Sequence, residues 1–138
     1  MKNIILLMIT LLAGSLTSCT SSQEKSIELI NDSWTLEIIN GVSYNPDSGN
    51  GVWPVVEINL KEEKLTGNTS CNNMSGKVIV EGSKITFSDI VTTKMFCMES
   101  IEQEFLIALG KVNNYKTEKM KLFLFEDDTE LMILKKTE

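Results

Sequence analysis

Short apolar segments separated by clusters of turn-forming residues occupy most of this chain, and only one segment has the spacing of a helix. Segments of this length, bounded by Gly, Asn, Asp, Ser and charged residues, are typical of β-strands. They lie at residues 34–39, 55–60, 77–80, 84–87, 90–93, 121–125 and 131–134. Because no helix separates successive strands, a parallel doubly wound sheet is disfavoured. The pattern predicts one α+β domain with a mainly antiparallel sheet of seven or eight short strands.

Residues 100–113 have the helical spacing. Ser100 and Gln103 fit a capping box, and Asn113 with Asn114 is expected to end the helix. A single open sheet cannot bury both of its faces, so we expect a small, barrel-like curled sheet whose open face or mouth is covered by this helix. The apolar residues at spacings of three and four, which define the buried face, are Ile101, Phe105, Ala108, Leu109 and Val112.

Two further features of the pattern predict burial. Trp34, Leu36 and Ile38 alternate with the residues between them, which predicts a half-buried strand with these three side chains on one face. Residues 43–53 are rich in Gly, Asn, Pro and Asp and are predicted to form a loop. Trp53 ends this loop, and we expect it either to make an exposed contact or to cover the end of the curled sheet.

The first 19 residues have the layout of a secretory signal. Lys2 precedes an apolar run at residues 4–12, which is followed by small residues up to Cys19. The run is shorter than the roughly 20 apolar residues that span a bilayer. Residues 16–19, Leu-Thr-Ser-Cys, resemble the lipobox of bacterial lipoproteins, in which the cysteine is lipidated and becomes the first mature residue. The alternative is an ordinary signal peptide. Thr20 after the cysteine resembles an outer-membrane sorting signal.

This interpretation divides the chain into three parts. Residues 1–18 are the lipoprotein signal peptide, Cys19 carries the lipid, and residues 19–26 form a polar tether with too few apolar residues to pack. The folded domain occupies residues 27–138, a length that supports one hydrophobic core. We therefore expect a domain that is anchored to the outer membrane by lipid and faces the periplasm or the cell surface.

The charged residues exclude some classes of function. The chain has 13 basic residues, all of them lysine, and 19 acidic residues, for a net charge of −6, and it has no histidine. Removing the signal peptide, which holds one lysine and no acid, changes −6 to −7. A negative chain argues against nucleic-acid binding. The missing histidine removes the usual general base and the commonest metal ligand, so we expect no enzyme activity, no cofactor and no metal site.

Cys71 and Cys97 remain after Cys19 is assigned to lipid. In an oxidising envelope compartment a disulfide is the default expectation, and closing residues 72–96 into a loop would stabilise the domain by about 3–4 kcal/mol. Two buried free thiols are one alternative. A catalytic or metal-binding pair is another, although no histidine is present to activate a thiolate.

The cysteines lie in two motifs whose residue types and spacing are informative. The motif residues are Gly67, Asn68, Cys71, Asn72, Ser75 and Gly76 in the first, and Thr93, Lys94, Met95, Phe96 and Cys97 in the second. With Trp34, Leu36, Glu104, Phe105 and Leu109, they resemble the META domain (HslJ-like) family of bacterial lipoproteins over nearly all of residues 27–138. Ser70, Lys94 and Phe96 depart from the usual family pattern.

The resemblance implies a small barrel-like α+β domain and no established catalytic activity. Members are associated with heat-shock response, envelope integrity and tolerance of antibiotics such as novobiocin. We therefore expect a noncatalytic envelope lipoprotein that supports the envelope under stress by binding another envelope component through its loops. Its partners would be the membrane, through the N-terminal lipid, and an envelope protein.

Two other functions are compatible with the residues. The carboxylates of Glu126, Asp127, Asp128 and Glu130 could serve a carboxylate-based enzyme or a Ca²⁺ site, although a solvated hairpin turn explains them as well and the spacing lacks the glycine and terminal glutamate of an EF-hand loop. Met95, Phe96 and Met98 could bind a small apolar ligand. We expect these three side chains to be core residues instead.

Overall fold

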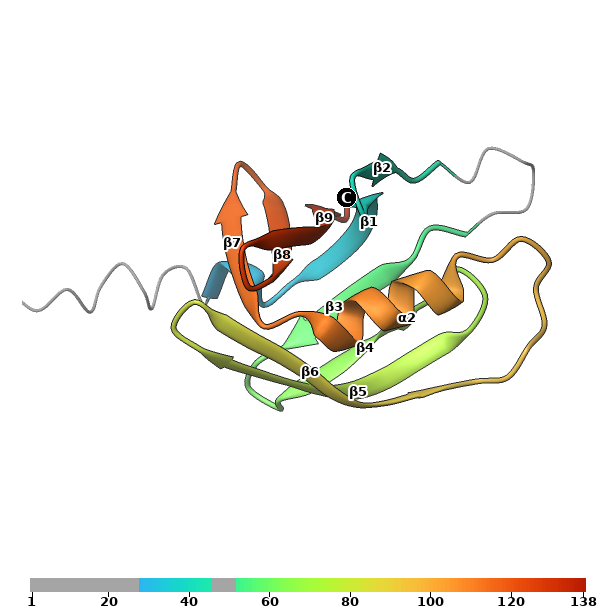
Figure 1. Cartoon of the computed structure of the whole chain (residues 1–138). Coiled ribbons are helices and arrows are strands. Elements are labelled where there is room, and N and C mark those ends of the chain that lie inside the picture. Colours follow the sequence, from blue (N-terminus) through green and yellow to red (C-terminus); the bar gives the residue numbers. More distant parts are fainter. Residues whose placement is uncertain (1–27, 46–51) are drawn as a thin grey trace, which may run out of the picture.

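The computed structural model describes residues 28–45 and 52–138 (Figure 1). The predicted signal peptide, Cys19, the tether and the middle of the predicted 43–53 loop lie outside this range. A helical turn at residues 28–30 precedes the first strand. The strands are β1 (Ser33–Ile39), β2 (Val42–Ser43), β3 (Val55–Asn59), β4 (Lys64–Asn68), β5 (Asn73–Glu81), β6 (Lys84–Thr92), β7 (Asn114–Glu118), β8 (Lys121–Glu126) and β9 (Thr129–Lys136).

These strands form one antiparallel sheet that curls into a ring. Its order is β2-β1-β3-β4-β5-β6-β7-β8-β9, and a further pairing of β1 with β9 brings the ends together. The joint between β6 and β7 holds a single residue pair, Lys84 with Asn114. The helix α2 (Glu102–Lys111) connects these two strands and lies across β3 to β6 in the view of Figure 1. The predicted α+β class, the mainly antiparallel sheet and the single covering helix are confirmed.

The core lies between the inner face of the ring and α2. Phe105, Ala108 and Leu109 are the buried residues of the helix. They belong to one hydrophobic cluster with side chains from almost every strand, and each such burial stabilises the fold by about 1.5–3 kcal/mol. The strand residues with the least exposure are Leu36, Val56, Leu65, Val78, Ile85, Leu122, Leu124, Met132 and Leu134.

A β-bulge changes which side of β1 is buried. Trp34 and Leu36 are buried as predicted, but Ile38 is only half-buried and Ile39 takes the core position. The pairing of β1 with β9 shifts register between Leu36 and Ile38. An extra residue at a bulge inverts the alternation beyond it, so the prediction for Ile38 was wrong.

The helix ends and several strands also differ from expectation. The predicted capping box is absent, because the Ser100 hydroxyl accepts a hydrogen bond from the Glu102 N–H at 3.1 Å and Gln103 is exposed. The helix ends at Lys111, earlier than predicted, and residues 114–118 form β7. The predicted strands at residues 84–87 and 90–93 are one strand, β6, and the predicted ranges lacked β2, β4 and β7, so the described sheet has nine strands and not seven or eight.

An ion pair at the start of β1 should make stability depend on pH. The pKa of the Asp32 carboxyl lies below its ordinary value. The largest cause is the Lys136 ammonium of β9, and the second is the hydrogen bond that Asp32 accepts from the backbone N–H of Ser33. Because this pKa is lower in the folded state, the ion pair stabilises the fold fully at pH values above the unfolded-state pKa of about 3.9. The stabilisation is lost as the pH falls through the folded-state pKa. Unfolding by urea at a series of acidic pH values should show this loss for the wild type and a smaller one for Asp32→Asn. Asp128→Asn, in an exposed turn, should behave like the wild type.

Candidate functional site

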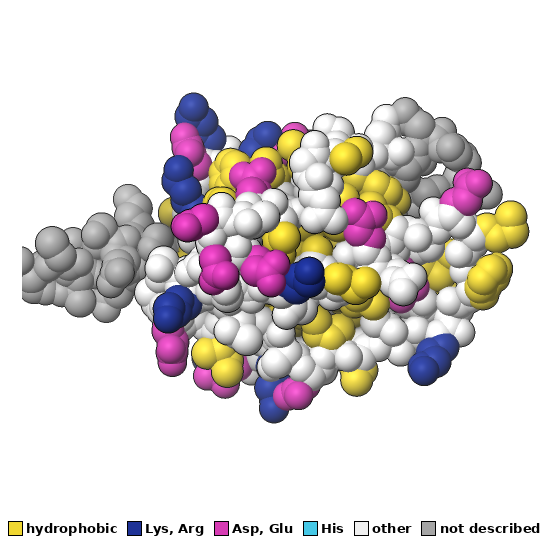
Figure 2. All heavy atoms as spheres, in the orientation of Figure 1, with side chains coloured by type: hydrophobic (Ala, Val, Ile, Leu, Met, Phe, Trp, Pro, Cys, Tyr) yellow, Lys and Arg dark blue, Asp and Glu magenta, His cyan; other side chains and the backbone are white. Residues whose placement is uncertain are grey.

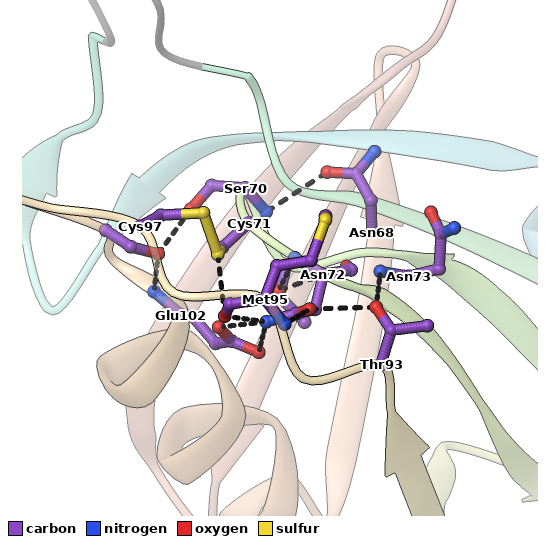
Figure 3. Close-up of a disulfide and its surroundings, with 11 residues drawn as sticks. Asn68, Ser70, Cys71, Asn72, Asn73, Thr93, Met95, Cys97 and Glu102 are labelled. Atoms are coloured by element: carbon purple, nitrogen blue, oxygen red, sulfur yellow. Dashed lines mark hydrogen bonds between the residues drawn. A yellow bond between two sulfur atoms is a disulfide. The ribbon is translucent and has the colours of Figure 1, made fainter.

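A disulfide joins two loops at one end of the molecule (Figure 3). Cys71 lies in the short connection between β4 and β5, and Cys97 lies in the segment between β6 and α2. Their Cα atoms are 5.8 Å apart, and the residues are separated by 26 positions. We call residues 93–101 the 93–101 loop. In this structure both sulfur atoms are in the bond, so neither is a free thiol.

The β4–β5 connection is a tight turn held by Thr69 and Asn72. The Thr69 hydroxyl accepts from the Asn72 N–H at 3.0 Å and lies 3.1 Å from the Asn72 carbonyl oxygen, which also accepts from the Thr69 N–H at 2.8 Å. The side chain of Asn68 accepts from the Ser70 N–H at 3.1 Å. Both Thr69 and Asn72 are buried. The Asn- and Ser-rich composition therefore serves to satisfy backbone groups in a turn, as such residues commonly do.

Asn72 also fixes the 93–101 loop to the turn. Its side-chain oxygen accepts from the Met95 N–H at 2.7 Å and from the Thr93 hydroxyl at 2.8 Å. Its side-chain nitrogen donates to the Met95 carbonyl oxygen at 3.1 Å and to the Glu102 carboxylate at 2.9 Å. Figure 3 shows these groups converging on Asn72 from both loops and from the start of α2. One buried amide thus holds both backbone polar groups of Met95.

Two further contacts connect the same parts. The Ser70 and Ser100 hydroxyls lie 3.1 Å apart, and the Thr93 hydroxyl also accepts from the Asn73 N–H at 3.1 Å. Sequence reasoning selected Asn72, Thr93 and Met95 as motif residues but missed Glu102. The signal for Glu102 was its place in the first turn of the helix, where an acidic residue is favoured by the helix dipole.

The apolar side chains of the 93–101 loop face solvent. Phe96 is 90% exposed, Met98 82% and Met95 61%. Figure 2 shows hydrophobic side chains at the end of the molecule where this loop lies in Figure 1. The expectation that these three residues belong to the core was wrong. The physical reason is that the backbone of Met95 is turned toward Asn72 and Cys97 is tied to Cys71, so the loop runs over the surface and not into the ring.

Such exposure is unfavourable for an isolated soluble domain. Burying a Phe or Met side chain is favourable by about 1.5–3 kcal/mol. Single exposed apolar residues are ordinary, but several together in a short loop commonly mark an interaction site. Here the loop is also held in place before any partner arrives, which lowers the entropy lost on binding. The arrangement suits a binding surface.

Two motif glycines are required by the sheet. A Cβ on Gly67 would lie 1.9 Å from the Val55 carbonyl oxygen, and the φ of Gly67 is +149°. A Cβ on Gly76 would lie 2.8 Å from the Ser88 carbonyl oxygen, next to a bulge in the β5–β6 pairing. Ser75, the remaining motif residue, is half-buried in β5 opposite Thr66 and Val91. The first motif therefore shapes the strands that present the turn.

The other candidate residues lie on different elements of the fold. Among residues 28–45 and 52–138, no three His, Cys, Asp or Glu side chains are placed to hold a metal ion. The Asp127 side chain accepts from the Asn113 amide at 2.9 Å, in the β8–β9 turn. Trp53 is half-buried, with its ring edge-on to Tyr44 at 5.5 Å and the Lys135 ammonium 5.7 Å from its centroid. In the described part of the chain, no helix has the length and apolar character needed to cross a bilayer.

Removing the Asn72 side chain should loosen the 93–101 loop and destabilise the fold. Asn72→Ala would leave the Met95 N–H, the Thr93 hydroxyl and the Glu102 carboxylate without this partner, at a cost of about 2–3 kcal/mol. Urea unfolding would measure this loss, and slower amide exchange at Met95 in the wild type than in the variant would locate it. The matched control is Asn73→Ala, an exposed neighbour, which should change stability little. Equal effects of the two substitutions would contradict the role given to Asn72.

Comparison with known proteins gives solved structures with a similar fold. An NMR structure of a protein from Burkholderia xenovorans is similar at 19% identity over 83% of this chain and 88% of that chain, with a TM-score of 0.66. A crystal structure of a DUF4847 family protein from Bacteroides vulgatus is similar at 15% identity over 80% of this chain and 96% of that chain, with a TM-score of 0.57. No curated protein matches the sequence.

These structural similarities show the fold alone. The family is shown by a model of the META domain, which matches residues 27–138, the whole of the predicted folded part. The matched region includes the disulfide, both motifs and the complete ring. The chain therefore belongs to the META domain family.

Proposed function

We propose that this protein is a noncatalytic lipoprotein of the bacterial cell envelope that supports the envelope under heat or antibiotic stress by binding another envelope component. Lipid on Cys19 would anchor it to the outer membrane, and the tether would connect the anchor to the META domain. The 93–101 loop would make the contact. The observation that carries this proposal is the exposure of Met95, Phe96 and Met98 on a loop fixed by the Cys71–Cys97 disulfide.

Two properties of the site support binding over chemistry. The polar side chains nearest the loop are engaged with backbone or with one another, as Asn72 is with Met95 and Glu102. The exposed side chains of the loop include the charged Lys94 and Glu99, but Met95, Phe96 and Met98 present apolar carbon and sulfur, which contribute affinity through burial and not through proton transfer. A rigid apolar surface of this kind is typical of an interaction module.

Complementation of a deletion strain would test the proposal. The strain lacking the gene should be more sensitive to heat or to novobiocin, and the wild-type gene should restore tolerance. A Phe96→Ser/Met98→Ser variant should fold but fail to restore tolerance. Met120→Ser, which changes a methionine that is 70% exposed in the β7–β8 turn, is the matched control and should restore it. A deletion without any change in tolerance would contradict the proposed function.

The anchor has its own test. Cys19→Ala should prevent lipidation and release the domain from the membrane fraction, without affecting its fold, because Cys19 lies outside the domain matched by the family model. Growth with radiolabelled palmitate would show label on the wild type and none on the variant. Labelled Cys19→Ala protein, or unlabelled wild type, would exclude the lipoprotein assignment.

A further inference from the structure

We propose that the 93–101 loop inserts its apolar side chains into the surface of a lipid bilayer. The inference deepens the proposed function and rests on it, since it assigns the bound envelope component to lipid. It gives the domain a second, noncovalent attachment to a membrane in addition to the predicted lipid on Cys19. The loop would then contact acyl chains and lipid headgroups, and not a groove on a protein.

The charge pattern around the loop favours lipid. Residues 90–98 contain one charged side chain, Lys94, and no acid, but the 93–101 loop also contains Glu99, which is exposed and directly follows Met98. A carboxylate is costly within the apolar part of a bilayer. A lysine is tolerated at its edge, because its long chain lets the ammonium reach the headgroups. Residues 95–98, which carry no charge, would therefore enter the bilayer, while Lys94 and Glu99 on either side would stay at the level of the headgroups.

The shape of the loop favours lipid as well. Phe96 and Met98 are almost fully exposed, so they project from the molecule instead of lining a hollow. A protein partner would need a groove that matches these side chains, whereas acyl chains adapt to them. Val91, near the end of β6, is 64% exposed and adds apolar surface beside the loop. The disulfide and Asn72 keep the backbone of Met95 in place during insertion.

The predicted tether is long enough to allow both attachments. The blue start of the described chain and the segment between β6 and α2 lie at opposite ends of the domain in Figure 1. The eight residues between Cys19 and residue 28 could extend to roughly 28 Å, which is less than the diameter of roughly 34 Å of a sphere whose radius of gyration is about 13 Å, so both attachments require the domain to lie along the membrane. A domain lying with its long direction along the membrane could bring both ends to the same surface. One weak insertion beside a covalent anchor is effective because the anchor keeps the loop at high local concentration.

Flotation with lipid vesicles would test the inference without the covalent anchor. The chain from Thr20 onward, made without signal peptide or lipid, contains every core residue from Ile30 to Leu134. It should float with vesicles of phosphatidylethanolamine and phosphatidylglycerol, and high salt should not release it, because the contact is apolar. Phe96→Ser should reduce the partition coefficient about tenfold or more. Met98→Asp should abolish flotation, and Met120→Asp, the matched control at another exposed methionine, should not.

The outcomes separate this inference from the proposed function. Failure of the wild-type chain to float, or equal flotation of Met98→Asp and Met120→Asp, would overturn the lipid assignment. A second contradicting result would be a chain that does not float with vesicles but whose photo-crosslinking residue at position 96 forms a specific adduct with one envelope protein. That result would overturn the lipid assignment and leave the proposed function in place. Loop-dependent flotation together with a deletion strain of normal tolerance would support lipid insertion and contradict the proposed stress role.

Discussion

Replacing both Cys71 and Cys97 with serine is expected to lower the free energy of unfolding by about 3–4 kcal/mol. The disulfide closes a loop across 26 positions, and chain-entropy arithmetic for a loop of this size gives that magnitude. Urea unfolding of the oxidised wild type and the double variant would measure the difference. The wild type in reductant should match the double variant, because both lack the same crosslink.

The double variant should also lose the function of the loop. Without the disulfide, Asn72 alone would hold Met95, and the 93–101 loop would sample more conformations. Met98→Ser is the control for stability, because its exposed side chain adds little to the folded state. A double variant as stable as the wild type would show that the disulfide is not a structural element of this domain.

Gly67→Ala is expected to destabilise the protein by roughly 3 kcal/mol or more. The new Cβ would lie within 1.9 Å of the Val55 carbonyl oxygen, so β3 and β4 would have to separate at the point where they pair. The φ of +149° adds backbone strain for any residue with a side chain. Thermal or urea unfolding would detect the loss, and low recovery of soluble protein is the expected result if the loss exceeds the total stability.

Gly110→Ala is the matched control for this substitution. A Cβ at Gly110 would meet no atom within 4 Å, and the residue lies in α2, where alanine is favoured over glycine by roughly 0.5–1 kcal/mol. The control should therefore be slightly more stable than the wild type. A Gly67→Ala protein with wild-type stability would mean that β3 and β4 lie farther apart at Gly67 than in this structure.

Much of this architecture could be predicted from local sequence patterns. The strands with regular alternation and the helix with regular spacing were located because burial of one face imposes those periods. The bulge in β1 could not be predicted, because the register shift depends on pairing with β9, almost a hundred residues later. The strand β7 was missed because only Tyr115 is buried among its residues, so the segment has no apolar alternation.

The candidate site was predicted in part. The expected Cys71–Cys97 disulfide joined the two motifs, but the motifs did not indicate the contacts of Asn72 or the direction in which the apolar side chains point. Met95, Phe96 and Met98 have the composition of core residues, and composition alone assigns such residues to the interior. Their exposure follows from tertiary contacts, since Asn72 binds the backbone of Met95 from a strand connection 23 residues earlier in the sequence.

The proposed function requires an envelope lipoprotein that presents an apolar loop fixed by a disulfide. Mass spectrometry of the mature protein, extracted from its native membrane without reductant, would detect the lipid and the disulfide in one experiment. We expect an N-terminal peptide that begins at lipidated Cys19 and a crosslinked pair of peptides that contain Cys71 and Cys97. Free thiols at Cys71 and Cys97, or an unmodified N-terminus at another residue, would contradict it.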